Sequence, residues 1–302
     1  MRALNGAQGL INDSHYRLIR NPLNKTITDF RETTKKLVTI NELTVRGWHV
    51  SNPTTPKLYG LLKVHKQGPL KMRPIVSNIG AVTEKLSKWL VKTFKEIGPI
   101  GGMSVANSQE FIEKIRNIKL KRTESLVSFD VVSLFPSVPI NDAIQFLEDW
   151  LLEQGVGARR TKDLVELTRL CMRHNDFSFR DGFHTMLNGT AMGNSLSPFL
   201  AEIFLAKLEK ELAKDKKFPR LWIRYVDDVF SIVPTRKANE TLRWLNGSRF
   251  QTISFTMETE IDRDLPFLDV MVSRDDDEVL SVRPYRKPTA TQRTILRTSD
   301  HV

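Results

Sequence analysis

Cysteine is nearly absent, since Cys171 is the only one among 302 residues. A lone thiol excludes a disulfide framework and a cysteine-based zinc site, and it is typical of a reducing compartment. Long apolar runs are also missing, because no stretch approaches the roughly 20 residues that a membrane helix needs. The opening segment, MRALNGAQGLINDSHYR, lacks the apolar core of a signal peptide. These absences predict a soluble intracellular protein that does not contact a membrane.

Acidic residues are outnumbered by basic ones, 35 against 46, which gives a net charge of +11. A polyanion is therefore the first partner to consider, although charge alone does not separate nucleic-acid-binding proteins from other basic proteins. Hydrophobic residues make up 40% of the chain, which predicts a packed core and excludes intrinsic disorder. The length favours two folding units, with one large domain as the alternative.

Periodicity and turn residues predict the order of helices and strands. Two β-prone runs flank Gln67-Gly68-Pro69, and two more flank Asp181-Gly182, so each pair is predicted to form a hairpin. Two further strands are expected within 221–234, joined at Asp227-Asp228. Apolar residues at helical spacing predict helices over 107–119, 140–154, 161–174, 195–212 and 236–246, the fourth of them amphipathic. Single strands are expected over 125–135, 251–259, 266–273 and 279–285. This order predicts an α+β fold in which helices back an antiparallel sheet.

Three aspartates lie inside apolar strand-like runs. Asp130 is embedded in LVSFDVV, and Asp227 and Asp228 divide LWIRYVDDVFSIV. A carboxylate near a packed core costs several kcal/mol unless something neutralises it. Mg²⁺ does so well, and it typically takes one or two protein carboxylates together with substrate phosphates. The pattern therefore favours a metal-dependent phosphoryl-transfer site.

Simpler interpretations of these carboxylates remain open. An Asp-Asp pair is common in ordinary turns, and Asp130 alone could pair with an arginine. The acidic run Asp275–Glu278 illustrates the point, because we interpret it as a solvated turn between two strands.

Seven sequence blocks, in order, resemble a reverse transcriptase. Three are similar to the polymerase palm: FDVVSLFPSVP, GTAMGNSLSP and YVDD. Four more resemble those of Penelope-like retroelements, eukaryotic elements whose polymerases are akin to telomerase: LYGLLKVHK, LKMRPIVSN, LPFLDV and YRKPT. The resemblance covers the chain from about Pro56 to Thr289.

The resemblance implies a right-hand polymerase with fingers and palm, in which an antiparallel palm sheet is backed by helices. It divides the chain into a helical or linker extension, a fingers portion, the palm and a truncated tail, over 1–55, 56–124, 125–290 and 291–302. A thumb and a GIY-YIG endonuclease, which many such elements carry, are not expected within this sequence.

The implied activity is that of an RNA-directed DNA polymerase with two Mg²⁺ ions. Asp130 and Asp227 match the metal-binding aspartates, and Asp228 matches the second position of the catalytic pair. The backbone of Val131 is expected to give an additional metal contact.

The resemblance also implies a nucleotide-binding set. Lys71 and Arg73 match basic residues that contact the incoming triphosphate. On an extended strand these two side chains share a face, and arginine offers a planar fork suited to phosphate. Phe135 matches the residue that packs under the sugar and resists a ribose 2′-hydroxyl. Met192 and Gly193 match the loop beside the nascent base pair, where many reverse transcriptases have glutamine in place of this methionine.

Template and primer contacts are implied for a third set. Ser197 and Pro198 match a helix start that supports the template, and serine there is expected to cap the helix. Leu265 and Pro266 lead into the region of the primer-holding hairpin. Lys63 is expected to extend the basic patch, or else to be solvated on a surface hairpin.

The expected partners are an RNA template, a DNA primer and deoxynucleoside triphosphates, with a nuclear location and no indication of oligomeric state. One alternative is an RNA-dependent RNA polymerase, although a bulky Phe135 would crowd a 2′-hydroxyl. Another is a catalytically inactive, truncated nucleic-acid-binding remnant. A metal-dependent nuclease shares the carboxylates but does not explain Lys71, Arg73 or Gly193.

Overall fold

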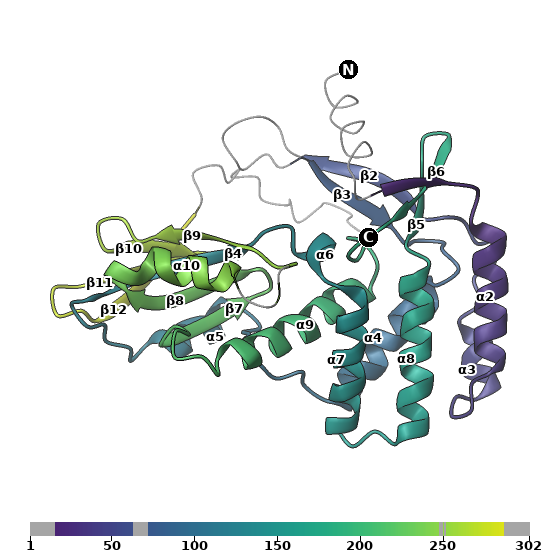
Figure 1. Cartoon of the computed structure of the whole chain (residues 1–302), viewed down its shortest axis with the longest axis horizontal. Coiled ribbons are helices and arrows are strands. Elements are labelled where there is room, and N and C mark those ends of the chain that lie inside the picture. Colours follow the sequence, from purple (N-terminus) through teal and green to yellow (C-terminus); the bar gives the residue numbers. More distant parts are fainter. Residues whose placement is uncertain (1–15, 63–71, 248–249, 251, 287–302) are drawn as a thin grey trace, which may run out of the picture.

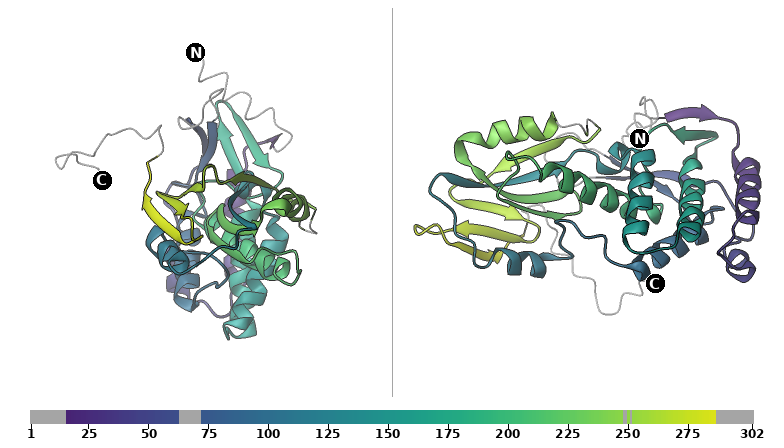
Figure 2. Two further views of the ribbon diagram at one scale, coloured as in Figure 1. Left: turned by 90° about the vertical axis from the view of Figure 1, so that its left-hand side faces the viewer. Right: turned by 60° about the horizontal axis from the view of Figure 1, so that its bottom comes forward.

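The computed structural model describes residues 16–62, 72–247, 250 and 252–286. The molecule is elongated, with a four-stranded sheet at one end and the helices α2 (Leu23–Lys35) and α3 (Glu42–Gly47) at the other (Figures 1 and 2). A bundle of helices lies between them. Antiparallel sheets packed on helices confirm the predicted α+β fold class.

The four-stranded sheet has the order β7-β8-β4-β9 and is antiparallel throughout. Its strands are β4 (Glu124–Val131), β7 (Leu221–Tyr225), β8 (Asp228–Pro234) and β9 (Phe255–Thr259). Side chains alternate along β4, so Val127, Phe129 and Val131 all enter the core formed with the helices. Leu126 points the opposite way and joins a second core. Both faces are therefore packed near the start of β4.

The first face of this sheet packs on α9 (Leu196–Leu212) and on α10 (Ala238–Asn246), and its apolar core continues into the central helices. These are α9 itself, α4 (Glu84–Ile97), α7 (Ile140–Glu153) and α8 (Ala158–Arg173). The helix α9 lies between the four-stranded sheet and α7 (Figure 1), and it is buried on most of its circumference. The helix lies where it was predicted, but it is not amphipathic as expected, because Ala201, Leu205 and Glu209 are buried in addition to the predicted apolar positions.

The second face is covered by α5 (Ser108–Ile115) and a three-stranded sheet. That sheet contains β10 (Asp264–Phe267), β11 (Val270–Arg274) and β12 (Leu280–Pro284) in this order. Phe111 of α5, Phe230 of β8 and Phe267 of β10 contact one another and link the helix, the four-stranded sheet and the three-stranded sheet. The prediction of one strand over 266–273 was wrong. Leu268 has a φ of 55°, which turns the chain back and makes a hairpin of β10 and β11.

A five-stranded sheet of order β1-β6-β5-β2-β3 lies beside the helices. Its strands are β1 (Tyr16–Ile19), β2 (Lys57–Leu62), β3 (Met72–Ser77), β5 (Asp176–Phe179) and β6 (Gly182–Met186). The antiparallel pairs β2–β3 and β5–β6 confirm the two predicted pairings, although Gln67–Pro69 lie outside the described residues. The sheet combines β1, which precedes residue 56, with β2 and β3 from 56–124 and with β5 and β6 from beyond residue 125. It therefore crosses the predicted domain limits, which stay a prediction.

Two short helices complete the description, α6 (Leu134–Ser137) after β4 and α10 (Ala238–Asn246) after β8. Across the described ranges, no helix combines the length and apolar character needed to cross a bilayer.

Cys171 provides a test of the packing around α8. It is buried, and this burial raises the pKa of its thiol to about 12. At pH 8 the thiol is then almost entirely protonated, while the thiolate is the reactive form. We expect a colorimetric thiol reagent to label the native chain orders of magnitude more slowly than the urea-unfolded chain. Equal labelling rates in the two states would contradict the packing described here.

Candidate active site

Two neighbouring strands bring the three embedded aspartates together. Asp130 lies directly opposite Asp228 in the β4–β8 register. The amide of Val131 donates a hydrogen bond to the carbonyl oxygen of Asp227, at 2.9 Å. Asp227 lies in the two-residue turn between β7 and β8, whereas Asp228 is the first residue of β8. The backbone pairing thus makes neighbours of aspartates that lie nearly a hundred positions apart in the sequence.

The aspartates lie where the second face of the sheet becomes accessible. Asp130 shares this face with Leu126, which is fully buried, and with Ser128, which is half-buried. Asp130 and Asp227 are half-buried, and Asp228 is exposed. The carboxylates therefore border solvent at the end of an otherwise packed sheet, where a substrate can reach them.

This donor set suits a hard cation that brings further ligands with it. Two like charges directly opposite each other on a sheet repel, so a cation between Asp130 and Asp228 would be stabilising. Within the described ranges, no group of three or more His, Cys, Asp or Glu side chains could hold an ion. Mg²⁺ does not require such a cage, because it takes one or two carboxylates and completes its shell with phosphate and water.

The turn that carries Asp227 contains a conformational outlier. Val226 has a φ of 56° although it is β-branched, and 44% of its surface is exposed. A bulky residue in the left-handed region is strained, and such strain persists only where the surroundings hold it in place. The conformation of this turn is therefore imposed by its contacts and not by its sequence.

The loop 189–194 contacts the helix α6, which follows the strand of Asp130. The amide of Thr190 donates to the carbonyl of Phe135 at 2.8 Å. Gly189 has a φ of 71°, and a Cβ placed on it would lie 2.3 Å from the carbonyl oxygen of Pro136. The predicted sugar-contacting residue Phe135 thus lies against this loop and is half-buried.

The same loop contacts β3, the strand that carries Arg73. The amide of Val76 donates to the carbonyl of Met192 at 2.7 Å. Gly193 has a φ of 116°, and a Cβ on it would lie 2.3 Å from the carbonyl oxygen of Val76. Arg73 is exposed on β3, and Met192 is half-buried. The loop therefore connects the five-stranded sheet with the segment that follows Asp130.

The predicted template and primer residues differ in accessibility. Ser197 is fully buried, and its hydroxyl donates to the carbonyl of Ala191 at 2.7 Å. The expectation that it caps α9 was wrong. The helix begins at Leu196, and the carboxamide of Asn194 accepts the hydrogen bond from the Leu196 amide. Pro198 is exposed in the first turn of α9.

Leu265 is buried in the second core, and Pro266 is half-buried on β10. The remaining predicted basic residues, Lys63 and Lys71, lie outside the described residues.

A comparison with protein families identifies this site. Residues 64–253 match the profile described as reverse transcriptase (RNA-dependent DNA polymerase). The chain belongs to the reverse transcriptase family. The matched range contains the three aspartates, the loop 189–194 and Arg73.

Solved structures with a similar fold include fungal telomerases. Telomerase from Candida albicans, in complex with a TWJ fragment of telomeric RNA, has a TM-score of 0.53 at 11% identity. That alignment covers 86% of this chain and 50% of the telomerase. Apo telomerase from Candida tropicalis has a TM-score of 0.54 at 10% identity, with 86% and 53% covered. The reverse transcriptase chain thus spans about half the length of these telomerases, and the likeness is one of fold. No curated protein matches it in sequence.

The sequence predictions for this reverse transcriptase missed a buried ion cluster beside the aspartate turn. Arg224 on β7 pairs with Glu209 at 2.6 Å and with Glu202 at 2.7 Å, both on α9. Two signals point to it. Arginine interrupts the apolar run LWIRYV, and the two glutamates lie seven positions apart on one face of an apolar helix.

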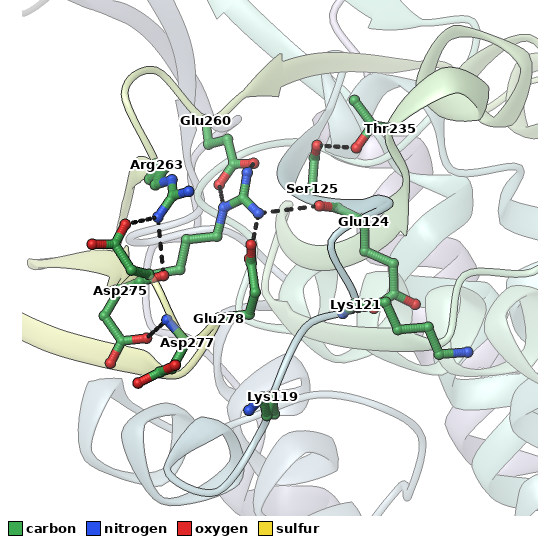
Figure 3. Close-up of polar contacts among 12 residues, drawn as sticks. Lys119, Lys121, Glu124, Ser125, Thr235, Glu260, Arg263, Asp275, Asp277 and Glu278 are labelled. Atoms are coloured by element: carbon green, nitrogen blue, oxygen red, sulfur yellow. Dashed lines mark hydrogen bonds and ion pairs between the residues drawn. The ribbon is translucent and has the colours of Figure 1, made fainter.

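A second ion cluster anchors the three-stranded sheet of the reverse transcriptase. Figure 3 shows the carboxylates of Glu260 and Glu278 and the backbone carbonyl of Glu124 around one guanidinium group, which belongs to Arg274. Burial opposes the charge of Arg274, but hydrogen bonds and ion pairs with Glu278 and Glu260 raise its pKa. The interpretation of Asp275–Glu278 as a solvated turn was therefore wrong for Glu278, which is buried against Arg274.

The close backbone approach at Gly193 gives a testable prediction. Gly193→Ala places a methyl group against the Val76 carbonyl and imposes a φ that alanine avoids. We expect a loss of more than about 1 kcal/mol in the free energy of unfolding, measured with urea. Gly157→Ala is the matched control, because nothing lies within 4 Å of its Cβ position and its φ is −59°. Equal effects of the two substitutions would be inconsistent with the packing of the loop on β3.

Proposed function

We propose that this chain is an RNA-directed DNA polymerase that extends a DNA 3′ end on an RNA template. The observation that carries the proposal is the juxtaposition of Asp130 with Asp227 and Asp228 at the solvent-facing end of the sheet. Membership in the reverse transcriptase family supports the same reading. The RNA-bound telomerase among the structures of similar fold is compatible with an RNA template.

The carboxylates of Asp130 and Asp227 would hold two Mg²⁺ ions, with a further contact from the backbone of Val131. When bound, these ions would promote ionisation of the primer 3′-hydroxyl and neutralise the charge that develops on the phosphates. Asp228, directly opposite Asp130, adds negative charge to the same cation site.

The other predicted residues would orient the reactants. Arg73, together with Lys71, would bind the triphosphate of the incoming deoxynucleotide through charge-assisted hydrogen bonds. Phe135 would pack under the sugar, while Met192 and Gly193 would support the new base pair. In this arrangement the 3′-hydroxyl oxygen attacks the α-phosphorus, its proton is lost, and pyrophosphate leaves. The contacts of the loop 189–194 with α6 and β3 support such an assembly.

The chain's finer assignment rests on its sequence blocks. We propose that it derives from a Penelope-like retrotransposon and acts in the nucleus. The template-side contacts would come from Lys63 and the start of α9 at Ser197 and Pro198. Because Ser197 is buried, its contribution would be to hold the preceding loop in place. Leu265, from within the second core, and Pro266, half-buried beside it on β10, would shape the primer-holding hairpin.

Primer extension tests the proposal directly. In an assay with an RNA template, a DNA primer, deoxynucleotides and Mg²⁺, we expect the wild-type chain to extend the primer. Asp227→Ala should lower the rate at least about 100-fold, because it removes a proposed metal ligand. Asp277→Ala is the matched control, since it removes an exposed carboxylate from a different turn. Activity that survives Asp227→Ala would refute the assignment, and wild-type RNA binding without extension would favour a non-catalytic remnant.

Phe135 separates a DNA polymerase from an RNA polymerase. If its ring packs under the sugar, Phe135→Ala should relax discrimination against ribonucleotides by about tenfold or more, since a few kcal/mol of steric exclusion is removed. The ratio of kcat/KM for a deoxynucleotide and the matching ribonucleotide measures this effect. Phe135→Tyr keeps the bulk of the ring and should retain the discrimination. An unchanged ratio in Phe135→Ala would argue against this role.

A further inference from the structure

Arg224 is the largest fully buried side chain of the described residues, with 1% of its surface exposed. All of its guanidinium nitrogens donate hydrogen bonds. Nε and Nη2 contact the carboxylate of Glu209 at 2.6 and 3.4 Å, and Nη1 and Nη2 contact that of Glu202 at 2.7 and 2.9 Å. Glu209 is itself 1% exposed, whereas Glu202 is 25% exposed. The guanidinium is thus held in one orientation by two carboxylates of α9.

The remaining contact of Arg224 leaves this cluster and reaches the aspartate turn. Nη1 donates to the carbonyl oxygen of Val226 at 3.2 Å. Val226 is the residue with the left-handed φ, and it immediately precedes Asp227. The backbone of Arg224 is also fixed, because its amide donates to Met103 and its carbonyl accepts from Val105. The guanidinium of Arg224, itself held by two carboxylates, therefore fixes the Val226 side of the turn, where the backbone is strained.

The opposite side of the turn is held by a different contact, from the amide of Val131 to the carbonyl of Asp227. Arg224 projects from β7 toward α9, on the face of the sheet opposite to that of Asp130 and Asp228. It therefore does not contact the substrate side, and any effect on the chemistry is transmitted through the backbone of the turn.

We infer that Arg224 is a positioning residue that sets the orientation of the Asp227 carboxylate by clamping the Val226 carbonyl. This inference rests on the proposed function only in assigning Asp227 to metal binding. Planar geometry is essential to the clamp, because one guanidinium must serve two carboxylates and a carbonyl at once. A lysine would keep the positive charge, but its three donors lie on one nitrogen and cannot reach the acceptors that three guanidinium nitrogens contact in Glu209, Glu202 and Val226.

The test compares Arg224→Lys with Trp222→Phe. The Trp222 indole also donates to Glu209, at 2.9 Å, but has no contact with the turn. Trp222→Phe therefore perturbs the same buried carboxylate without releasing Val226. Mn²⁺ affinity, followed by the loss of its free-ion EPR signal, provides a readout that is independent of turnover. Asp227→Asn gives the baseline for an impaired site.

We expect Arg224→Lys to weaken Mn²⁺ binding and to lower kcat, each by about 10- to 100-fold, which is the range for groups that orient metal ligands. KM for the deoxynucleotide should change little. Trp222→Phe should leave both Mn²⁺ affinity and kcat near wild type. Adding Val226→Asn to Arg224→Lys should restore part of both, because asparagine tolerates the left-handed conformation without a clamp.

A milder variant keeps the test decisive should Arg224→Lys fail to fold. Glu202→Gln acts at the more exposed end of the cluster and leaves Glu209 paired, but it loosens the nitrogen that contacts Val226. It should weaken Mn²⁺ binding in the same direction and by less.

Unchanged Mn²⁺ affinity in the folded Arg224 and Glu202 variants would overturn the inference. So would an equal loss in Trp222→Phe, which would indicate a general effect of the buried cluster. A wild-type chain that binds Mn²⁺ through Asp227 without extending primers would contradict the proposed function. In that case the Mn²⁺ comparison would still decide the role of Arg224.

Discussion

The register of β4 against β8 is the constraint on which the site depends. In this register Asp130 faces Asp228, and Val127, Phe129 and Val131 all enter the helical core. A slip of one residue would exchange the two faces and drive Asp130 into that core. The large apolar area on the helical side therefore fixes the position of the carboxylates. Apolar packing, which involves none of the aspartates, therefore holds the end of the sheet that carries them in place.

The second organising feature is the loop 189–194, which joins two parts of the molecule through backbone contacts. The backbone of Pro136 approaches Gly189, and that of Val76 approaches Gly193, so closely that neither position has room for a side chain. Hydrogen bonds from Thr190 to α6 and from Val76 to Met192 fix the loop on both sides. The segment after Asp130 and the strand of Arg73 are thereby coupled without an extended side-chain interface.

Local patterns in the sequence predicted much of this architecture, because they depend on neighbours only. The strand β4, the hairpin at Asp181-Gly182 and the helices α7 and α8 all follow from local composition, short-range periodicity and turn chemistry. Family membership followed from the order of the blocks. The roles of the individual site residues stay predictions, although the structure brings Asp130 and Asp227 together and places the Gly193 loop against α6, the helix that follows the strand of Asp130.

The failures share a physical cause, since each depended on tertiary packing. The apolar run through Leu268 has the composition of one strand, and only its packing on α5 reveals the turn. Asn194 and not Ser197 accepts a side-chain hydrogen bond from the first residue of α9, because the Ser197 hydroxyl is used in the loop contact. Glu278 is buried because β11 supplies Arg274 as its partner. Arg224 was overlooked because its pairing with Glu202 and Glu209 exists only when α9 is placed beside β7.

The strand β1 has an implication for how the chain acquires its structure during synthesis. Among the residues that the structure describes, Tyr16–Ile19 pair with β6 alone, at Phe183–Met186, so most of the helical bundle separates the two partners in the sequence. On a ribosome, β1 emerges long before any strand that can accept it, and β5 and β6 emerge after α8. The five-stranded sheet can therefore be completed only after α8 has been synthesised, when β5 and β6 are available and β1 can pair along the free edge of β6.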